Sequence, residues 1–184
     1  MIVRLPFVLG AIFIALAVHM ASVLSMPRLT ANDLFARLLP RTPVNEVTPV
    51  STEQAEALNL PFFDPAFEIA ACRYDLSGGV LRLRAQVPET LLLVSLVAKG
   101  GGVYFTVTDR ASIKGTVELL IGTDAQIGEI ENADQEDASV GELRVRAPSR
   151  DGVAVIRAFA PMPSVRGRAA ATVSQATCQI ETLN

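Results

Sequence analysis

The sequence predicts a mainly β protein: an antiparallel β-sandwich or barrel that follows an N-terminal transmembrane helix and carries a short C-terminal helix. Three observations predict this fold class. Residues 5–26 are apolar without a formal charge, apolar and polar residues alternate with a period of two in several later segments, and turn residues separate those segments. We therefore divide the 184-residue chain into an anchor (1–28), an amphipathic helix with a tether (29–60) and a β-sandwich domain (61–184).

The segment 5–26 is long enough to cross a bilayer. As a helix its 22 residues would extend about 33 Å, and a hydrocarbon core is about 30 Å thick. A cleaved signal peptide is the alternative, because Arg4 precedes the apolar run and small residues occur near its end. The run is longer than the usual 7–15 residues of a signal peptide, and no clean A-x-A site follows it. We expect an uncleaved anchor.

The charges on either side of the anchor do not determine its orientation. Arg4 lies before it, and Arg28, Arg37 and Arg41 lie after it, which slightly favours a cytoplasmic C-terminus. We expect the opposite orientation, with the C-terminal domain outside the cytoplasm, because a long folded domain is translocated largely regardless of such charges.

Between the anchor and the sandwich, helical segments are predicted at two places. Residues 30–39 offer an N-cap and an apolar face formed by Leu34 and Leu38, and Pro40 should end this helix. The rest, to about residue 60, is typical of a tether, with helical character only in the segment S-T-E-Q-A-E-A-L.

The sandwich itself is predicted from five segments. Apolar and polar residues alternate in 80–87, 102–108 and 141–147, and the apolar runs 91–98 and 117–122 are typical of strands buried on both faces. The Ala-rich segment 166–178 predicts a helix. The acidic stretch 129–137 has five carboxylates in nine residues without the spacing of a calcium loop, so we expect a solvated loop.

Several kinds of site are excluded by composition. His19, the only histidine, lies in the membrane segment, so the domain cannot build a Ser-His-Asp, Cys-His or His-ligated metal site. We expect no catalytic, cofactor-binding or metal-binding residue. Nucleic acid is not an expected partner either, because the chain beyond residue 41 carries 12 basic and 18 acidic residues.

The two cysteines allow two arrangements. Cys72 falls in the segment A-A-C-R-Y-D-L, which we expect to be a further strand and the first of the sandwich, and Cys178 lies near the chain end. If the domain is exported, the two residues are expected to form one disulfide. In a cytosolic domain they would be two buried free thiols.

The segment F-F-D-P-A-F-E-I-A-A-C-R-Y-D-L-S-G-G-V-L-R-L-R-A (62–85) resembles the opening block of the domain of unknown function 1254 family. Further matches are V-Y-F-T-V-T-D-R (103–110), V-A-V-I-R-A-F-A-P (153–161) and Cys178. The resemblance is to the short, membrane-anchored members found in alphaproteobacteria. The chain departs from the family at Thr90, Leu91 and Leu92, where an aromatic residue is usual. The charged and aromatic positions of the matched motifs are Asp64, Arg73, Tyr74, Asp75, Asp109 and Arg110.

This resemblance implies a jelly-roll-like β-sandwich in the periplasm, held by a single helix (residues 5–26) in the bacterial inner membrane. It implies no established activity. We therefore expect an interaction or envelope module. The alternative is a hydrolase or carbohydrate-active domain, or half of one, that uses carboxylates such as Asp75 and Asp109 in a jelly-roll cleft. Long family members continue into a domain of unknown function 1214, so a separately encoded protein that resembles this second domain is the expected partner.

Overall fold

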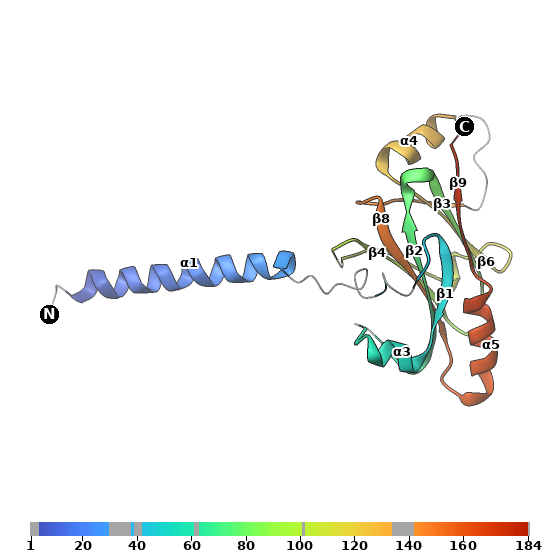
Figure 1. Cartoon of the computed structure of the whole chain (residues 1–184), viewed down its shortest axis with the longest axis horizontal. Coiled ribbons are helices and arrows are strands. Elements are labelled where there is room, and N and C mark those ends of the chain that lie inside the picture. Colours follow the sequence, from blue (N-terminus) through green and yellow to red (C-terminus); the bar gives the residue numbers. More distant parts are fainter. Residues whose placement is uncertain are drawn as a thin grey trace.

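The computed structural model describes residues 4–29, 38, 42–60, 63–100, 102–133 and 142–183. Helix α1 (Leu5–Leu29) extends away from the rest of the chain (Figure 1). Its apolar span Leu5–Met26 has a mean hydropathy of 2.4 and is long and apolar enough to cross a membrane. None of this span is buried against the rest of the protein. The helix predicted over 30–39 lies outside the described residues, except for Leu38.

The remaining described residues form a mainly β domain of two sheets, as predicted. The two sheets pack face to face, and the main core lies between them. The five-stranded sheet has the order β1 (Glu46–Val50), β2 (Phe67–Asp75), β8 (Asp151–Phe159), β4 (Leu92–Ala98) and β5 (Val103–Thr108). The four-stranded sheet has the order β7 (Leu143–Arg146), β6 (Thr116–Gly122), β3 (Val80–Gln86) and β9 (Thr177–Glu181).

The strand pairs are antiparallel, with one exception that corrects the prediction. Strand β7 runs parallel to β6, with Leu119 opposite Leu143. The connection between them passes through helix α4 (Asp124–Ala133), and a crossover of this kind returns the chain to the end from which it left, so the two strands run in the same direction. The alternating and apolar segments predicted from the sequence correspond to β3, β4, β5, β6 and β7.

Strand β1 was predicted to be part of the tether and is instead the edge strand of the larger sheet. Its ladder with β2 runs from Glu46 opposite Arg73 to Val50 opposite Ile69. Pro49 lies inside this strand, and proline is confined to edge strands because it cannot donate to a ladder. The predicted helical segment that follows is α3 (Thr52–Ala57).

Two helix boundaries differ from the predictions. Residues 129–133 of the expected acidic loop belong to α4, and 134–137 lie outside the described residues. Helix α4 is held by the fully buried Ile127 and by the Gln126 side-chain amide, which donates to two backbone carbonyls. The C-terminal helix α5 (Pro163–Ser174) ends before Thr177 and Cys178, because these residues pair with β3 as part of β9.

Two short 3-10 helices, η2 (Leu76–Gly78) and η3 (Asp109–Ala111), lie directly after β2 and β5. A second apolar cluster lies on the outer face of the five-stranded sheet, away from the main core. Its buried members are Leu38, Val50, Ala55, Ile69, Ala71 and Val153.

Candidate functional site

An apolar cavity of about 280 Å³ lies within this second cluster. Its floor is the outer face of the five-stranded sheet, and parts of its wall come from Leu38, Leu60 and Phe63. Nine of its twelve lining residues are apolar. The lining residues are Leu38, Val50, Leu60, Phe63, Ile69, Ala71, Ser95, Val97, Val103, Thr106, Val155 and Arg157.

The strand registers explain why these side chains share one face. Residue Val155 of β8 lies opposite Ala71 of β2 on one side and opposite Ser95 of β4 on the other. Ser95 in turn lies opposite Thr106 of β5. Because side chains alternate between faces along a strand, this row points to one side of the sheet. A register shift between Leu96 and Val97 then places Val103 of β5, and not Tyr104, opposite Val97.

Polar groups gather at one part of the cavity wall. The guanidinium of Arg157 donates from Nη2 to Ser95 Oγ over 3.2 Å, and the Thr106 hydroxyl lies 3.3 Å from the same oxygen. The Nε of Arg157 is buried without a hydrogen-bond partner among the described residues. The cavity therefore combines an apolar body with one cationic side chain.

Three of the matched-motif residues, Asp64, Tyr74 and Arg73, lie in or next to β2. The Asp64 carboxylate accepts from the backbone N–H of Ala66 over 2.8 Å and forms a turn before β2. The Tyr74 side chain is buried in the main core. Arg73 lies on the same face of β2 as Ile69 and Ala71, and its Nε is buried without a partner in the described part of the chain.

The structure does not bring Asp75 and Asp109 together. Asp75 ends β2 and lies opposite Asp151, the first residue of β8. Asp109 follows Thr108, which lies opposite Leu93, and Leu93 lies opposite Arg157 near the far end of β8. The two carboxylates are therefore at opposite ends of the sheet, and neither lines the cavity. A hydrolytic site built on this pair has no support in the structure.

Of these two carboxylates, Asp75 has a capping role, whereas the cap of η3 is Thr108 and not Asp109. Asp75 accepts from the backbone N–H of Ser77 over 2.8 Å, and the hydrogen bonds from Ser77 lower its pKa. Asp109 begins η3, and its Oδ1 is buried without a described hydrogen-bond partner. The backbone N–H of Arg110 donates to the Thr108 hydroxyl, and the Arg110 side chain is exposed.

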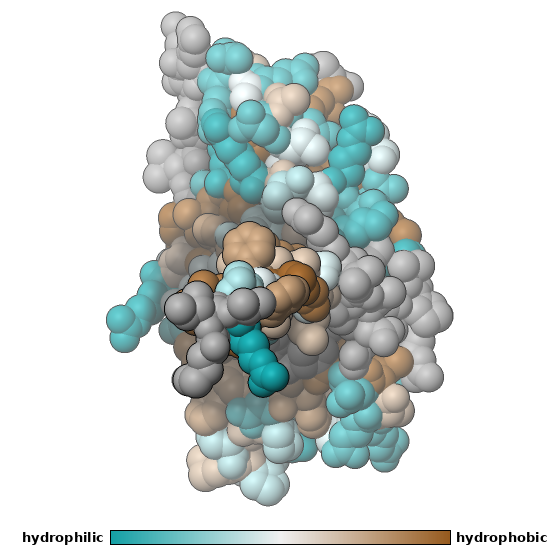
Figure 2. Space-filling view, turned by 90° about the vertical axis from the view of Figure 1, so that its left-hand side faces the viewer, coloured by the Kyte–Doolittle hydropathy of each residue, from teal (hydrophilic) through white to brown (hydrophobic). Residues whose placement is uncertain are grey.

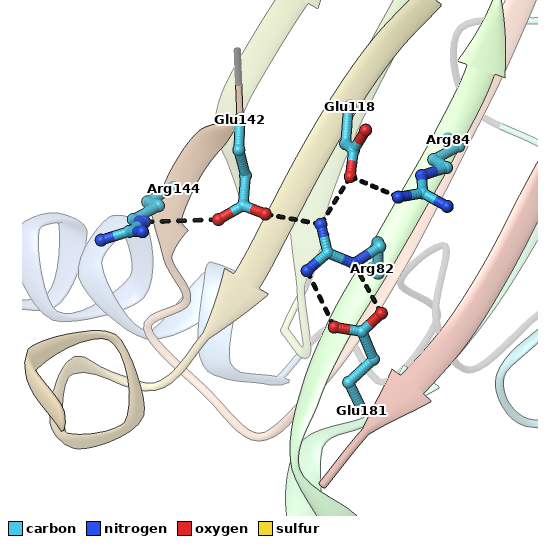
Figure 3. Close-up of polar contacts among 6 residues, drawn as sticks. All are labelled: Arg82, Arg84, Glu118, Glu142, Arg144 and Glu181. Carbon is cyan, nitrogen blue, oxygen red and sulfur yellow. Dashed lines mark hydrogen bonds and ion pairs between the residues drawn. The ribbon is translucent and has the colours of Figure 1, made fainter. Parts of the chain in front are cut away.

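A second polar cluster lies on the outer face of the four-stranded sheet (Figure 3). Arg82 is at its centre: Nη1 is 2.5 Å from carboxylate oxygens of both Glu118 and Glu142, and Nε is 2.6 Å from Glu181. Arg84 bonds Glu118 and Arg144 bonds Glu142, so the three arginines and three glutamates balance in charge. Sequence patterns indicated that Arg82, Arg84, Glu142 and Arg144 alternate with apolar residues. The run 117–122 was expected to be buried on both faces, and the structure corrects this, because Glu118 lies on the outer face of β6 within the cluster.

This cluster does not have the properties of a general acid site. Hydrogen bonds from Arg84 and Arg82 lower the pKa of Glu118, and those from Arg82 lower the pKa of Glu181. A general acid at neutral pH needs a carboxyl group whose pKa is raised. Among the described residues, no group of three or more His, Cys, Asp and Glu side chains is placed to hold a metal ion.

Cys72 and Cys178 form a disulfide that joins β2 of one sheet to β9 of the other. Their Cα atoms are 6.6 Å apart, and both side chains belong to the main core. Because the bond lies between the sheets, it fixes their packing and contributes no reactive thiol.

The cavity residues were not identified from the sequence, although two of them carried a signal. Arg157 is the only charged residue between Val153 and Pro161, and Ser95 interrupts the apolar run 91–98. A charged or polar residue inside an apolar strand indicates either an exposed face or a functional site. Only the structure distinguishes these two cases, because it shows that Leu38, Leu60 and Phe63 form a wall over this face of the sheet.

Comparison with known proteins identifies the fold and no activity. No family model and no curated protein matches the chain. The VPA0106 protein of Vibrio parahaemolyticus is similar in structure, with a TM-score of 0.55 and 12% identity over 78% of this chain and 32% of that chain. An uncharacterized protein from Burkholderia cenocepacia has a TM-score of 0.52 and 14% identity over 80% of this chain and 37% of that chain. The present chain thus spans about a third of the length of each.

Proposed function

We propose that this protein is a single-pass inner-membrane protein whose β-sandwich domain works in the periplasm as a binding or envelope module. One observation carries the proposal: the uncharged span Leu5–Met26 is helical, and no part of it is buried by the domain. A long apolar helix without a protein partner is stable in a bilayer, because every backbone group is satisfied internally and the side chains suit hydrocarbon.

The disulfide supports an exported domain. Disulfides persist in oxidising compartments such as the bacterial periplasm and are rare in the cytosol. The Cys72–Cys178 bond lies in the core of the domain, where it contributes to the fold.

A binding role is favoured over catalysis by the kind of site that is present. The cavity lining has nine apolar residues, one arginine and two hydroxyl side chains, and it holds no carboxylate or histidine that could transfer a proton. Such a lining is typical of ligand sites, which are mostly apolar with a few placed polar groups.

Topology is tested by a reporter fused after Asn184 in the full chain. A reporter that is active only outside the cytoplasm should be active, and the protein should stay in the membrane after alkaline extraction. Mass spectrometry should find the intact N-terminal segment. Activity of a cytoplasm-only reporter, or a mature chain that begins after residue 25, would overturn the proposal.

The resemblance to the domain of unknown function 1254 family leads to a second part of the proposal, a partner that resembles the domain of unknown function 1214. The similar solved structures, in which the matched fold occupies about a third of a longer chain, support the idea of a neighbouring domain. Crosslinking in intact membranes, followed by mass spectrometry, should recover such a protein. Recovery of uncrosslinked chain alone would count against the partner and leave the topology unaffected.

A further inference from the structure

Arg157 lies beside the apolar cavity, and the described residues supply no counter-charge to it. Among the described residues its side chain has one hydrogen bond, to Ser95, and no carboxylate partner. The Nε group is buried and bonds nothing in this part of the chain. A guanidinium that is partly removed from water without a counter-charge is unfavourable, and an anion bound beside it relieves that cost.

Ser95 has a hydrogen-bond donor available at the same place. Its Oγ receives the bond from Arg157 and lies in contact with the Thr106 hydroxyl. When Thr106 donates to this oxygen, the Ser95 hydroxyl hydrogen is left to donate to a ligand. The guanidinium and the hydroxyl are both donors, so together they suit a small anion with two acceptor oxygens, such as a carboxylate.

The rest of the cavity suits a hydrocarbon chain. Its apolar lining includes Ile69, Val97 and Val155, and the polar residues are confined to Ser95, Thr106 and Arg157. The volume of about 280 Å³ is at the lower end of the range for ligand pockets, about 300–1,000 Å³. This size suits one acyl chain better than the two chains of a phospholipid.

The cavity is also close in sequence to the membrane helix. Leu38 lines the cavity and follows Leu29, the last residue of α1, by nine positions. Nine residues span at most about 30 Å. Helix α1 projects from one side of the domain and is seen nearly end-on in the middle of Figure 2. A lipid leaving the bilayer surface would meet this side of the domain.

We propose that the cavity binds a free fatty acid, with the carboxylate at Arg157 and Ser95 and the chain along the apolar sheet face. The inference deepens the binding module proposed above and rests on it for the supply of the ligand from the membrane. Binding itself depends on the cavity alone, so it can fail or succeed independently of the orientation of α1.

The test uses the full chain in phosphatidylcholine nanodiscs with a photoactivatable sixteen-carbon fatty acid. Crosslinked peptides are mapped by mass spectrometry, and labelling is measured against increasing unlabelled palmitate. We expect saturable labelling of strands β4, β5 and β8. The corresponding sixteen-carbon alcohol, which lacks the charge, should label these strands at least about tenfold less.

Two kinds of variant separate the contribution of the Arg157 charge from that of the cavity volume. Arg157→Gln should weaken fatty acid labelling about tenfold or more and leave alcohol labelling unchanged. Ala71→Trp should fill the cavity and abolish both. Val103→Trp should do the same from the edge strand β5, where the side chain of Val103 is 52% exposed. Arg168→Gln, at an exposed arginine on α5 outside the cavity, is the matched control and should label like the wild type.

Five outcomes would overturn the proposal. Labelling confined to α1 would mean that the probe had only dissolved in the bilayer. Equal labelling by acid and alcohol, or no effect of Arg157→Gln in a folded chain with an intact disulfide, would remove the role of the charge. Equal labelling of the cavity by a two-chain photoactivatable phospholipid, or crosslinks from the cavity to another protein chain, would identify a different occupant.

Discussion

The hydroxyl groups of Tyr74 and Tyr104 lie 2.8 Å apart and form a hydrogen bond inside the domain. Tyr74 belongs to β2 and Tyr104 to β5, so the pair reaches across the two strands between them, β8 and β4. The space for this contact exists because Gly152 of β8 lies directly opposite Tyr74. Burial raises the pKa of both phenols, so both stay neutral and able to share one hydrogen bond.

Gly152→Ala should therefore destabilise the domain by about 1–3 kcal/mol or more. A Cβ at this position would overlap the Tyr74 ring and the Val97 carbonyl oxygen. Urea unfolding of the full chain in detergent measures the loss. Gly128→Ala is the control, because a Cβ there meets nothing within 4 Å and the residue is helical, so this variant should gain about 0.5–1 kcal/mol. Equal stability of the two variants would contradict the packing argument.

Removing the disulfide should lower stability by up to about 4–5 kcal/mol, because the bond joins residues 106 positions apart and restricts the unfolded chain. Cys72→Ser and Cys178→Ser should each lower the melting temperature, and the double variant should fall no further than either single variant. Reductant should destabilise the wild type and leave the double variant unchanged. Additive losses would mean that the two thiols act independently.

Arg82→Met should destabilise the domain at neutral pH and reduce its sensitivity to acid. Arg82 lowers the pKa of Glu181 and contributes to the lowered pKa of Glu118, so the unfolded chain binds more protons than the folded one as the pH falls. The stability from these carboxylates is present above their unfolded pKa, about 4.5, and is lost as the pH drops through the lower folded values. Without Arg82, the three glutamates repel one another at neutral pH, and protonation removes this repulsion. The free energy of unfolding of the variant should therefore fall less in acid than that of the wild type.

Denaturant unfolding between pH 7 and pH 3 measures this difference. The wild type should lose stability through the acid range, and the slope should be smaller in Arg82→Met. Arg166→Met is a suitable control, since the Arg166 side chain is nearly half exposed and its partners, Glu68 and the Pro65 carbonyl oxygen, lie outside the network. The same slope in the wild type and Arg82→Met would show that the network does not set the acid response.

Ser51→Ala should loosen α3 by about 1 kcal/mol. The Ser51 hydroxyl accepts from the backbone N–H of Gln54, and the Gln54 side chain accepts from the backbone N–H of Ser51. The substitution removes the first bond of this capping box and leaves the backbone donor of the second in place. Hydrogen exchange should accelerate at the α3 amides and stay unchanged in β8. Thr52→Ala, one residue further on and outside the box, should leave exchange in α3 nearly unchanged.

The sequence was a good guide where a single strand or helix determines the pattern. Alternation in 80–87 and the apolar run 91–98 predicted β3 and β4 nearly to the residue, because each strand has a buried face that its own residues reveal. The apolar span of α1 was equally clear.

Features that depend on distant residues were missed. Strand β1 contains Pro49 and is recognisable only once β2 is available to pair with it. Thr177 and Cys178 continue an Ala-rich segment, and their strand conformation comes from the ladder with β3 and from the bond to Cys72. The cavity also depends on residues distant in sequence, since its floor and wall come from residues as far apart as Leu38 and Arg157.

The disulfide also determines how the domain would respond to a mechanical pull through α1. Force applied at the anchor enters the domain through β1, an edge strand whose ladder is with β2, and would peel it away first. The unravelling would stop at Cys72, because the disulfide closes residues 72–178 into a covalent ring. This ring contains β3 to β8 completely, the end of β2 and the start of β9. A chain held between a membrane and a load could thus lengthen by its N-terminal segment and shorten again, with both sheets kept together.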